Sequence, residues 1–546
     1  MTVQTERALW QQRIDVERVK REGLDVDLDR LEREGYDSLT AEEFYRLKTW
    51  GVCSQRTPGL HMIRVRVPGG RIEADRLRGV ANLSARLADG EAHITTRQNL
   101  ELHSVRSRRV REVLEGAAAL GLTTRSACGH TVRNIVGCSR SGVCAREPFE
   151  TRPTVVAIHD FFLANAARYN SRLPRRLNVY VAGCDGCMAH AQVNDLGFVA
   201  TARDGRPGFQ LWLGGSLASN PRLAHLLFDF VPAGEVLAVT EAVADTYCEN
   251  GFRDRPAKAR LKFLIEEWGP ERFTAAVLER LRELCPDTAV SAGTEPAVMG
   301  GDRRPAGGHA GVEPQRQEGL FMVEAHVLLG DLTGWQIETL AGLATEFADG
   351  ALYLTREQNV ELHGVAAEHV ERVADALAAV GLPARGAGSL VDVQVCAGSE
   401  WCVWGVGDSR GLARSMSADL SSLVEAEGCA EPLRVHISGC AHGCAQHTAA
   451  DVGLHAVVMR DAERNQVDGY EVHAGGRLGR DPVHGRRVGR VLGVEAGAAT
   501  AGILARYLRE RLPREAMPEF VERVGRDSVM PAGGAAAATG EEDAAP

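Results

Sequence analysis

Hydrophobic and charged residues alternate most clearly at positions 63 to 67. The odd positions are Ile or Val, and the even positions are Arg64 and Arg66. Successive side chains of a strand point to opposite faces, so this pattern predicts a β-strand with both arginines on one face. Pro68-Gly69-Gly70 predicts the end of the strand. Spacing alone leaves two interpretations open: the arginines lie in solvent, or they meet an anion.

A second alternating stretch runs from Arg176 to Tyr180. Leu177 and Val179 are hydrophobic, whereas Arg176, Asn178 and Tyr180 occupy the alternate positions. The same rule predicts a strand on which the last three residues share one face.

Other stretches have the spacing or the end signals of helices. The charged stretch from Glu17 to Arg33 and the capped start at Thr40 predict helices near the N-terminus. A hydrophobic stripe from Leu261 to Trp268 predicts a core helix that Gly269-Pro270 stops. Asn220-Pro221 before a hydrophobic run predicts another helix start, with Pro in the first turn.

The chain contains an internal repeat. Residues 95–103 (TTRQNLELH) recur as residues 355–363 (TREQNVELH) at an offset of 260, and Gly121-Leu122 recurs as Gly381-Leu382. A period this long indicates duplication of whole domains rather than a solenoid. The copies differ in charge, because Arg97 in the first aligns with Glu357 in the second.

The cysteines repeat in the same order. Cys138-x5-Cys144 is followed by Cys184-x2-Cys187, and Cys396-x5-Cys402 is followed by Cys440-x3-Cys444. Close pairs of thiols predict a four-thiolate metal site. An iron–sulfur cluster fits Cys396, Cys402, Cys440 and Cys444. A structural zinc site and buried thiols without metal are the alternatives, although five residues between Cys396 and Cys402 is long for zinc. Gly439 and Gly443 are expected to let the backbone approach the metal core.

Composition changes this picture little. The chain has 546 residues, 44% hydrophobic and 25% charged, with a net charge of −10, which argues against nucleic acid as the main partner. Thirteen cysteines without disulfide-like spacing favour a reducing compartment. No signal peptide or membrane span is evident, so we expect a cytoplasmic protein.

The motif Ser438-Gly-Cys-Ala-His-Gly-Cys-Ala445, with Cys396-x5-Cys402 before it, resembles the cluster signature of the ferredoxin-type sirohaem nitrite and sulfite reductases. The resemblance covers roughly residues 45–285 and 318–525. It implies sirohaem and a [4Fe–4S] cluster held by Cys396, Cys402, Cys440 and Cys444, with Cys444 also ligating the sirohaem iron.

The resemblance also assigns residues of the first copy. Those that match the anion-binding positions, and are therefore expected to be catalytic, are Arg64, Arg133, Arg176 and Asn178. Those that match cofactor-contacting segments are Gln55, Arg56, Arg66, Thr95, Arg97, Asn99 and Asn134. Guanidinium groups suit this role because they bind carboxylates and oxyanions bidentately and stay charged.

The sequence departs from the family pattern in two ways. Arg176 stands where the family usually has Lys, so that side chain cannot donate a proton at neutral pH. Cys138, Cys144, Cys184 and Cys187 form a second quartet, which is either a vestige of duplication left as buried thiols or a second metal site.

The implied activity is six-electron reduction of nitrite to ammonium by reduced ferredoxin. Nitrite is favoured because Asn178 stands where sulfite enzymes carry a second Lys. Sulfite reduction to sulfide is the alternative, followed by a precorrin-3B synthase-like enzyme and a non-catalytic iron–sulfur or zinc protein. The chain has no dinucleotide fingerprint, so we expect the electrons to come from another protein, and the resemblance implies that this donor is ferredoxin-like.

The implied fold class is α+β, with a pseudo-twofold duplication of ferredoxin-like half-domains and sirohaem-binding α/β domains. The expected divisions are an N-terminal helical extension (1–44), a first half-domain (45–125), a first, basic sirohaem-domain copy (126–285), a linker (286–317), a second half-domain (318–385), a second sirohaem-domain copy with the cluster (386–525) and a disordered tail (526–546).

Overall fold

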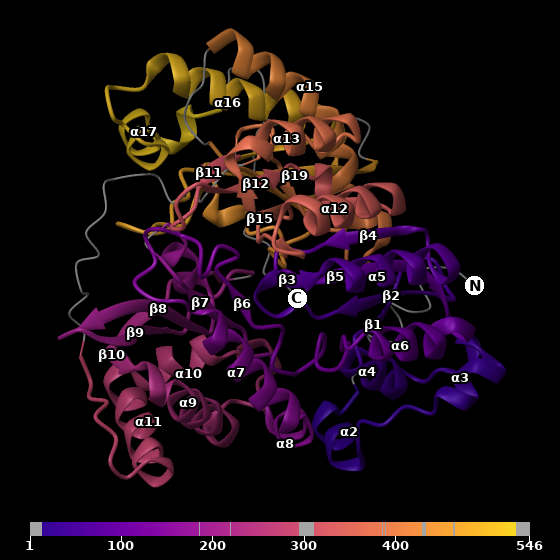
Figure 1. The fold of residues 1–546 in the computed structure, drawn as a ribbon, viewed down its shortest axis with the longest axis vertical. Coiled ribbons are helices and arrows are strands. Elements are labelled where there is room, and N and C mark those ends of the chain that lie inside the picture. Colours follow the sequence, from indigo (N-terminus) through magenta and orange to yellow (C-terminus); the bar gives the residue numbers. More distant parts are fainter. Residues whose placement is uncertain are drawn as a thin grey trace. The chain divides into compact units, whose positions relative to one another are not determined.

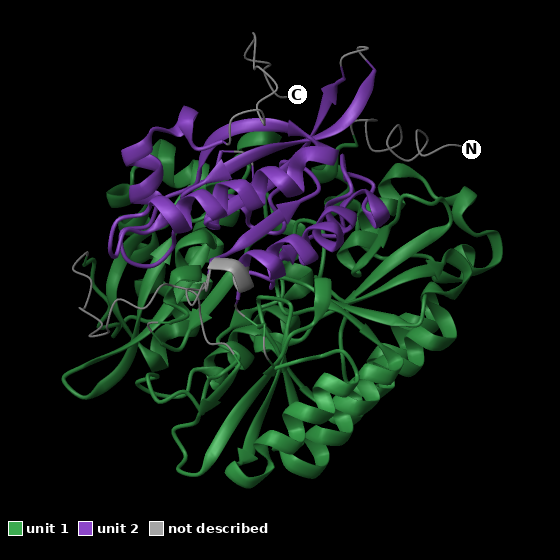
Figure 2. Cartoon of the chain, turned by 90° about the horizontal axis from the view of Figure 1, so that it is seen from above, with its two compact units in different colours: residues 1–216, 222–387 green, residues 217–221, 388–546 purple. Residues whose placement is uncertain are grey.

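The computed structural model describes residues 14–184, 186–218, 220–293, 311–384, 386–387, 389–427, 433–461 and 465–530. The chain forms two compact units (Figure 2): residues 1–216 and 222–387 make unit 1, and residues 217–221 and 388–546 make unit 2. Parts of the predicted extension, linker and tail (1–13, 294–310 and 531–546) lie outside the described residues.

Unit 1 contains two half-domains of the same construction (Figure 1). The elements of the first are β1 (Val52–Ser54), β2 (Leu60–Val65), β3 (Arg71–Glu73), α5 (Ala74–Leu87), β4 (Glu91–Ile94), β5 (Leu100–Arg106) and α6 (Val110–Ala119). Those of the second are β11 (Val312–Pro314), β12 (Leu320–Ala325), β13 (Asp331–Thr333), α12 (Gly334–Phe347), β14 (Ala351–Leu354), β15 (Val360–Ala366) and α13 (Val370–Ala379). The strand predicted around Arg64 is confirmed as β2, and β11 lies within the stretch predicted to be a linker.

The half-domains exchange a strand. The sheet orders are β1-β2-β5-β4-β13 and β11-β12-β15-β14-β3, so each sheet ends in a strand from the other copy. The amide of Gln98 donates to Leu354 O at 2.9 Å, and Gln358 donates to Ile94 O at the same distance. Gly70 is required here, because a Cβ atom on it would lie 2.2 Å from Leu354 O. One hydrophobic core runs through both copies.

The rest of unit 1 is a sheet of order β10-β9-β8-β7-β6 with helices. Its elements are β6 (Val136–Gly137), α7 (Arg152–Ala164), α8 (Ala166–Arg172), β7 (Val179–Ala182), β8 (Leu196–Arg203), β9 (Arg206–Leu213), β10 (His225–Pro232), α9 (Val236–Asn250), α10 (Leu261–Trp268) and α11 (Pro270–Leu284). The helix predicted from the 261–268 stripe is confirmed as α10. The helix predicted after Asn220-Pro221 is wrong, because the hydrophobic run there forms β10 against β9.

The N-terminal residues form α2 (Val16–Glu22), α3 (Leu28–Glu34) and α4 (Ala41–Thr49). The predicted start at Thr40 is confirmed: its hydroxyl accepts from the Glu43 backbone N–H, and the Glu43 carboxylate accepts from the Thr40 N–H. The stretch from Glu17 to Arg33 is two helices separated at Gly23 rather than one.

Unit 2 repeats the sheet of unit 1 in the order β16-β17-β18-β19-β20. Its elements are β16 (Gln394–Val395), α14 (Gly398–Trp401), α15 (Ser409–Glu427), β17 (Val435–Ser438), β18 (Val452–Arg460), β19 (Gln466–Ala474), β20 (Arg486–Leu492), α16 (Ala496–Glu510) and α17 (Met517–Val524). In both sheets the first two strands pair in parallel, and the cysteines follow their carboxyl ends.

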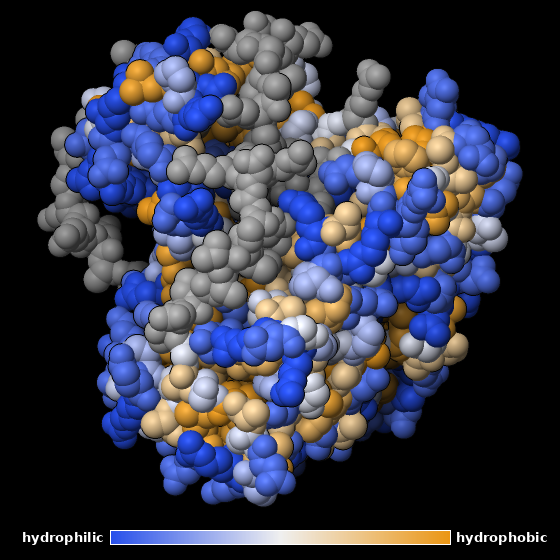
Figure 3. Space-filling view, turned by 60° about the vertical axis from the view of Figure 1, so that its left-hand side comes forward, coloured by the Kyte–Doolittle hydropathy of each residue, from blue (hydrophilic) through white to orange (hydrophobic). Residues whose placement is uncertain are grey.

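The face shown in Figure 3 is largely hydrophilic, with hydrophobic residues scattered among the polar ones. A surface of this mixed kind is ordinary for folded proteins. Among the described helices, none combines the length and the hydrophobicity needed to span a bilayer.

Candidate active site and cluster cysteines

Arg64 and Arg133 converge on one loop of unit 1. Arg64, on β2, donates to Ala127 O at 3.2 Å and to Cys128 Sγ at 2.9 Å. Arg133 donates to the same carbonyl at 3.0 Å and to Gly129 O at 3.0 Å. Two of the arginines predicted to be catalytic therefore lie side by side, although 69 positions separate them in the chain.

Arg66 is a buried cation, Arg97 and Arg133 are half-buried, and no carboxylate among the described residues pairs with any of the three. Arg66 donates only to the carbonyls of Arg125 and Arg133, at 3.2 and 3.1 Å, and in the described part of the chain none of the three forms a salt bridge. Burial lowers the pKa of Arg66 and of Arg97 to about 9. The Nε atom of each of the three is buried without a hydrogen-bond partner. Orphaned buried donors on these cations fit a ligand that carries carboxylates or is an oxyanion.

The turn between β4 and β5 presents Arg97. The Thr95 hydroxyl accepts from the backbone N–H groups of Arg97 and Asn99, at 3.2 and 3.1 Å. Asn134 donates to Arg97 O at 3.0 Å and to Val67 O at 2.9 Å, which ties the turn to the end of β2. Thr95, Asn99 and Asn134 thus position Arg97, while the Oδ1 atoms of the two asparagines stay buried without a partner.

Gln55 reaches Arg64 through two other residues. Its amide contacts His103 Nδ1 at 3.0 Å and accepts from the Ser104 N–H at 2.7 Å. His103 Nε2 lies 3.4 Å from Glu101, and Glu101 pairs with Arg64 at 2.6 Å. Gln55 therefore orients Arg64 indirectly, through His103 and Glu101. Arg56 lies in the turn after β1 and is half-buried.

Arg176 and Asn178 precede β7 and are half-buried. The backbone N–H of Asn178 donates to Asp195 at 2.8 Å, and Asp195 pairs with Arg260 at 2.8 Å. The side-chain Oδ1 of Asn178 is buried without a partner. Burial and the neighbouring cations, Arg176 among them, hold the pKa of His130 well below its usual value, so that imidazole is neutral.

Sequence reasoning missed two cysteines at this site. Cys53 and Cys128 are 75 positions apart, yet their sulfur atoms lie 3.0 Å apart. The hydrogen bond from Cys53, and then the charges of Arg64 and Arg133, hold the pKa of Cys128 well below its usual value. No spacing rule pairs these thiols. The nearest signal is that Cys128 comes five positions before Arg133.

The four cysteines of unit 2 follow two neighbouring parallel strands. Cys396 and Cys402 come after β16, and Cys440 and Cys444 come after β17. The Gly439 N–H donates to Cys396 Sγ at 3.1 Å, and burial raises the pKa of the Cys440 thiol to about 12. Cys444 is exposed, whereas the other three are half-buried. Thiols gathered at the ends of adjacent strands fit a cluster, and the exposed Cys444 is accessible to a second metal.

Gly439 and Gly443 each have a role in the backbone conformation, and their approach to the metal core stays a prediction. A Cβ atom on Gly439 would lie 2.5 Å from the Cα of Gly398, so this glycine allows two backbone segments to touch. Gly443 has a φ of 65° and packs against Ala218, which again reflects backbone conformation.

Comparison with known proteins identifies the family. The model of the nitrite and sulphite reductase 4Fe-4S domain matches residues 128–284 and 386–531. The model of the nitrite/sulfite reductase ferredoxin-like half domain matches residues 54–120 and 313–380. Together the two models match both copies of the repeat.

Individual relatives point the same way. The chain is 33% identical to ferredoxin–nitrite reductase of Synechococcus elongatus, over 85% of this chain and 90% of that protein. It is 28% identical to sulfite reductase [ferredoxin] 2 of Mycolicibacterium paratuberculosis, over 91% of each. Its fold matches that of the NirA protein of Mycobacterium tuberculosis with a TM-score of 0.86 and 26% identity, over 94% of this chain and 97% of that one. The chain belongs to the nitrite and sulfite reductase family, as an oxidoreductase whose cofactors are sirohaem and a [4Fe–4S] cluster.

Proposed function

We propose that this protein reduces nitrite to ammonium with six electrons from a reduced ferredoxin. The ferredoxin donor is supported by the names of the relatives above, which couple both nitrite and sulfite reduction to ferredoxin. When bound, sirohaem and the cluster supply the redox chemistry. The polypeptide supplies orientation and charge.

Four arginines of unit 1 are proposed to act in two groups. Arg66 and Arg97, whose Nε donors have no partner, would pair with carboxylates of the cofactor. Arg64 and Arg133 would hold the substrate anion and stabilise the negative charge that develops as its bonds to oxygen break. Because both are fixed by Ala127 O before substrate arrives, little reorganisation is needed during the reaction.

Nitrite, rather than sulfite, is supported by the side chain of Asn178. A neutral amide there leaves the site with less positive charge than a lysine would, which suits a monoanion better than sulfite with its second charge. The buried Oδ1 is an acceptor without a donor. Such an acceptor can bind the N–H groups that form as nitrite becomes ammonium, whereas sulfide offers fewer donors.

Protons for the reaction cannot come from Arg176, because a guanidinium does not lose its proton near neutral pH. Its proposed role is limited to charge. The protons would therefore arrive through water or a neighbouring group.

The test is anaerobic turnover of nitrite and sulfite side by side, with one reduced viologen donor and one preparation. We expect kcat/KM to favour nitrite, and Asn178→Lys to shift the ratio toward sulfite by about tenfold or more, the value of one added close charge contact. Asn250→Lys is the matched control: it places the same charge at the exposed end of α9 and should leave the ratio unchanged.

A wild-type preference for sulfite would overturn the nitrite assignment and leave the family assignment intact. Purified protein without a sirohaem spectrum would instead favour the precorrin-3B synthase alternative. The non-catalytic alternative is wrong, because the family consists of oxidoreductases.

A further inference from the structure

Three cysteines of unit 1 form a tight buried group. Cys138 follows β6, and Cys184 and Cys187 follow β7. Their sulfur atoms all lie within 4.8 Å of one another, and those of Cys184 and Cys187 are 3.7 Å apart. Cys144, also buried, is within hydrogen-bonding reach of Cys184. Three members of the second quartet, predicted as either a vestige or a metal site, are therefore assembled in space, with Cys144 beside Cys184.

The spacing of the sulfur atoms suits one ion. A zinc–sulfur bond of about 2.3 Å places the corners of a tetrahedral site about 3.8 Å apart. A four-iron cube keeps its ligand sulfurs farther apart, because each sulfur binds a different iron. Within the described residues, the cluster cysteines of unit 2 form no group as tight as that of Cys138, Cys184 and Cys187. The two quartets therefore differ in size as well as in sequence spacing.

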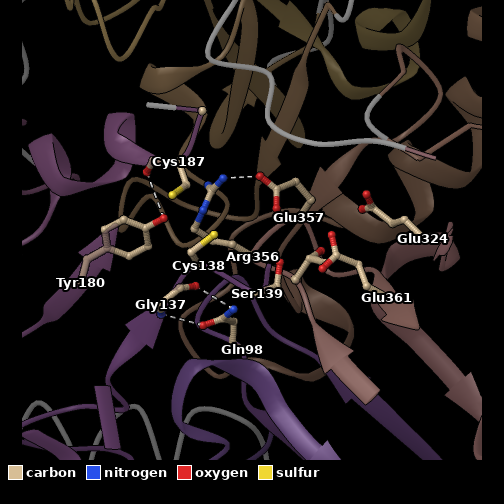
Figure 4. A pocket seen from close by; sticks show the side chains of 12 residues that line it. Gln98, Gly137, Cys138, Ser139, Tyr180, Cys187, Glu324, Arg356, Glu357 and Glu361 are labelled. Atoms are coloured by element: carbon tan, nitrogen blue, oxygen red, sulfur yellow. Dashed lines mark hydrogen bonds and ion pairs between the residues drawn. The ribbon is translucent and has the colours of Figure 1, made fainter. Parts of the chain in front are cut away.

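The backbone around Cys187 is arranged to stabilise a thiolate. The N–H groups of Gly183 and Cys184 both donate to Cys187 Sγ at 3.2 Å. The Tyr180 hydroxyl donates to Cys187 O at 3.0 Å and anchors the loop (Figure 4). Hydrogen bonds from N–H groups favour the charged form of a ligand, and two residues between Cys184 and Cys187 is a common spacing for zinc ligands.

The space beside the three cysteines is too small for a second sirohaem. Cys138 and Cys187 line a small cavity, of about 30 Å³, together with Glu324, Glu357 and Glu361 (Figure 4). This volume admits little more than a water molecule. A second sirohaem cannot enter a space of this size, and the glutamates along the wall are already paired with arginines, Glu324 and Glu361 with Arg140 and Glu357 with Arg356.

We propose that Cys138, Cys144, Cys184 and Cys187 bind one zinc ion, which joins the carboxyl ends of β6 and β7. Binding replaces the thiol protons with the metal and involves no electron transfer. These four cysteines are distinct from Cys396, Cys402, Cys440 and Cys444, the residues expected to hold the [4Fe–4S] cluster. It does not depend on nitrite being the substrate.

The experiment is metal and sulfide analysis of the anaerobically purified holoenzyme. We expect about one zinc per chain in addition to the iron of sirohaem and one cluster, and loss of that zinc in Cys187→Ser with the labile sulfide unchanged. Cys248→Ser is the control, because Cys248 is a buried cysteine on α9 outside the group, so the zinc should remain.

A second assay works on the wild type if Cys187→Ser fails to fold. Titration of the holoenzyme with an organic mercurial should release zinc in step with thiol modification, as detected by a chromogenic chelator. Extra iron and labile sulfide in place of zinc would overturn the proposal in favour of a second cluster. A metal-free protein, with these cysteines as thiols or as a disulfide in mass spectrometry, would overturn it as well. Neither result bears on nitrite turnover, so this proposal and the proposed function fail independently.

Discussion

The two half-domains of unit 1 have the same strands in the same register and opposite charges at the same point. In the first, β2 and β5 place Arg64 directly opposite Glu101. In the second, β12 and β15 place Glu324 directly opposite Glu361. Opposite charges across a strand pair attract, whereas like charges destabilise the pair. The second copy therefore needs a cation from elsewhere.

Arg140 supplies that cation from the sheet domain that follows the first half-domain. Its guanidinium is fully buried and contacts Glu361 at 2.5 Å, Glu324 at 3.0 Å and Glu313 at 3.1 Å. Among the described residues, Arg66, Arg97 and Arg133 of the first copy have no carboxylate partner, and their Nε atoms have no hydrogen-bond partner. The carboxylates of the second half-domain are thus compensated by an arginine of the first copy, whereas these three arginines can bind an anionic ligand.

Arg140→Met should have the largest effect of the variants that test this comparison. Removing one partner from a buried ionic group leaves the others uncompensated, which costs about 3–5 kcal/mol in the free energy of unfolding. Urea denaturation of the holoenzyme at pH 8 measures this loss in the free energy of unfolding. The double variant Arg140→Met/Glu324→Arg restores a cation opposite Glu361 and should recover much of the loss. If Arg140→Met unfolds like the wild type, the charge comparison fails.

The loss in Arg140→Met should also shrink as the pH falls. Burial would raise the pKa of Glu361, but Arg140 and then His363 hold it well below its usual value. A carboxylate with a lowered folded-state pKa stabilises the protein above its unfolded pKa of about 4.3 and loses this contribution as the pH falls through the folded value. Without Arg140, burial dominates and raises the pKa of Glu361. As the pH falls, this carboxyl is therefore protonated, and loses its unfavourable buried charge, earlier in the variant than in the wild type. The difference in unfolding free energy should therefore be smaller at pH 5 than at pH 8.

Arg97→Met and Glu357→Met compare the same turn in the two copies. A hydrogen bond to a charged group contributes about 1.5–3 kcal/mol, so loss of Arg97 should weaken sirohaem retention about ten- to a hundredfold. Glu357 is partly exposed and pairs with Arg356, and its replacement should leave sirohaem in place. The ratio of Soret to protein absorbance after purification reports retention. Equal loss of sirohaem from both variants would contradict the proposal that the first copy binds the cofactor carboxylates.

Gln98→Ala and Gln358→Ala test the strand exchange with the smallest expected effect. Each variant leaves a buried carbonyl of the other copy without its donor, which costs about 1–3 kcal/mol. The Gln98 amide also exchanges hydrogen bonds with Gly137, at 3.0 and 3.1 Å. Urea denaturation measures the loss in each variant, and a variant that unfolds like the wild type would contradict a stabilising role for its glutamine.

Short-range patterns in the sequence predicted much of this molecule. The alternation around Arg64 predicted β2, the cap at Thr40 predicted α4, and the repeat of residues 95–103 predicted the duplicated fold. The helix predicted after Asn220-Pro221 is wrong, because a hydrophobic run after a turn suits a strand as well as a helix. Pairing with β9 makes this run the strand β10.

The sequence by itself determined the duplication, the cysteine pairs and the arginines of the first copy, because these depend on residue type and spacing. Only the tertiary structure decided which charges are compensated. It placed Arg140 among three carboxylates, Cys53 against Cys128, and Cys138 beside Cys184 and Cys187. The physical reason is that charge compensation and metal coordination depend on distances of a few ångströms between residues that lie tens to hundreds of positions apart.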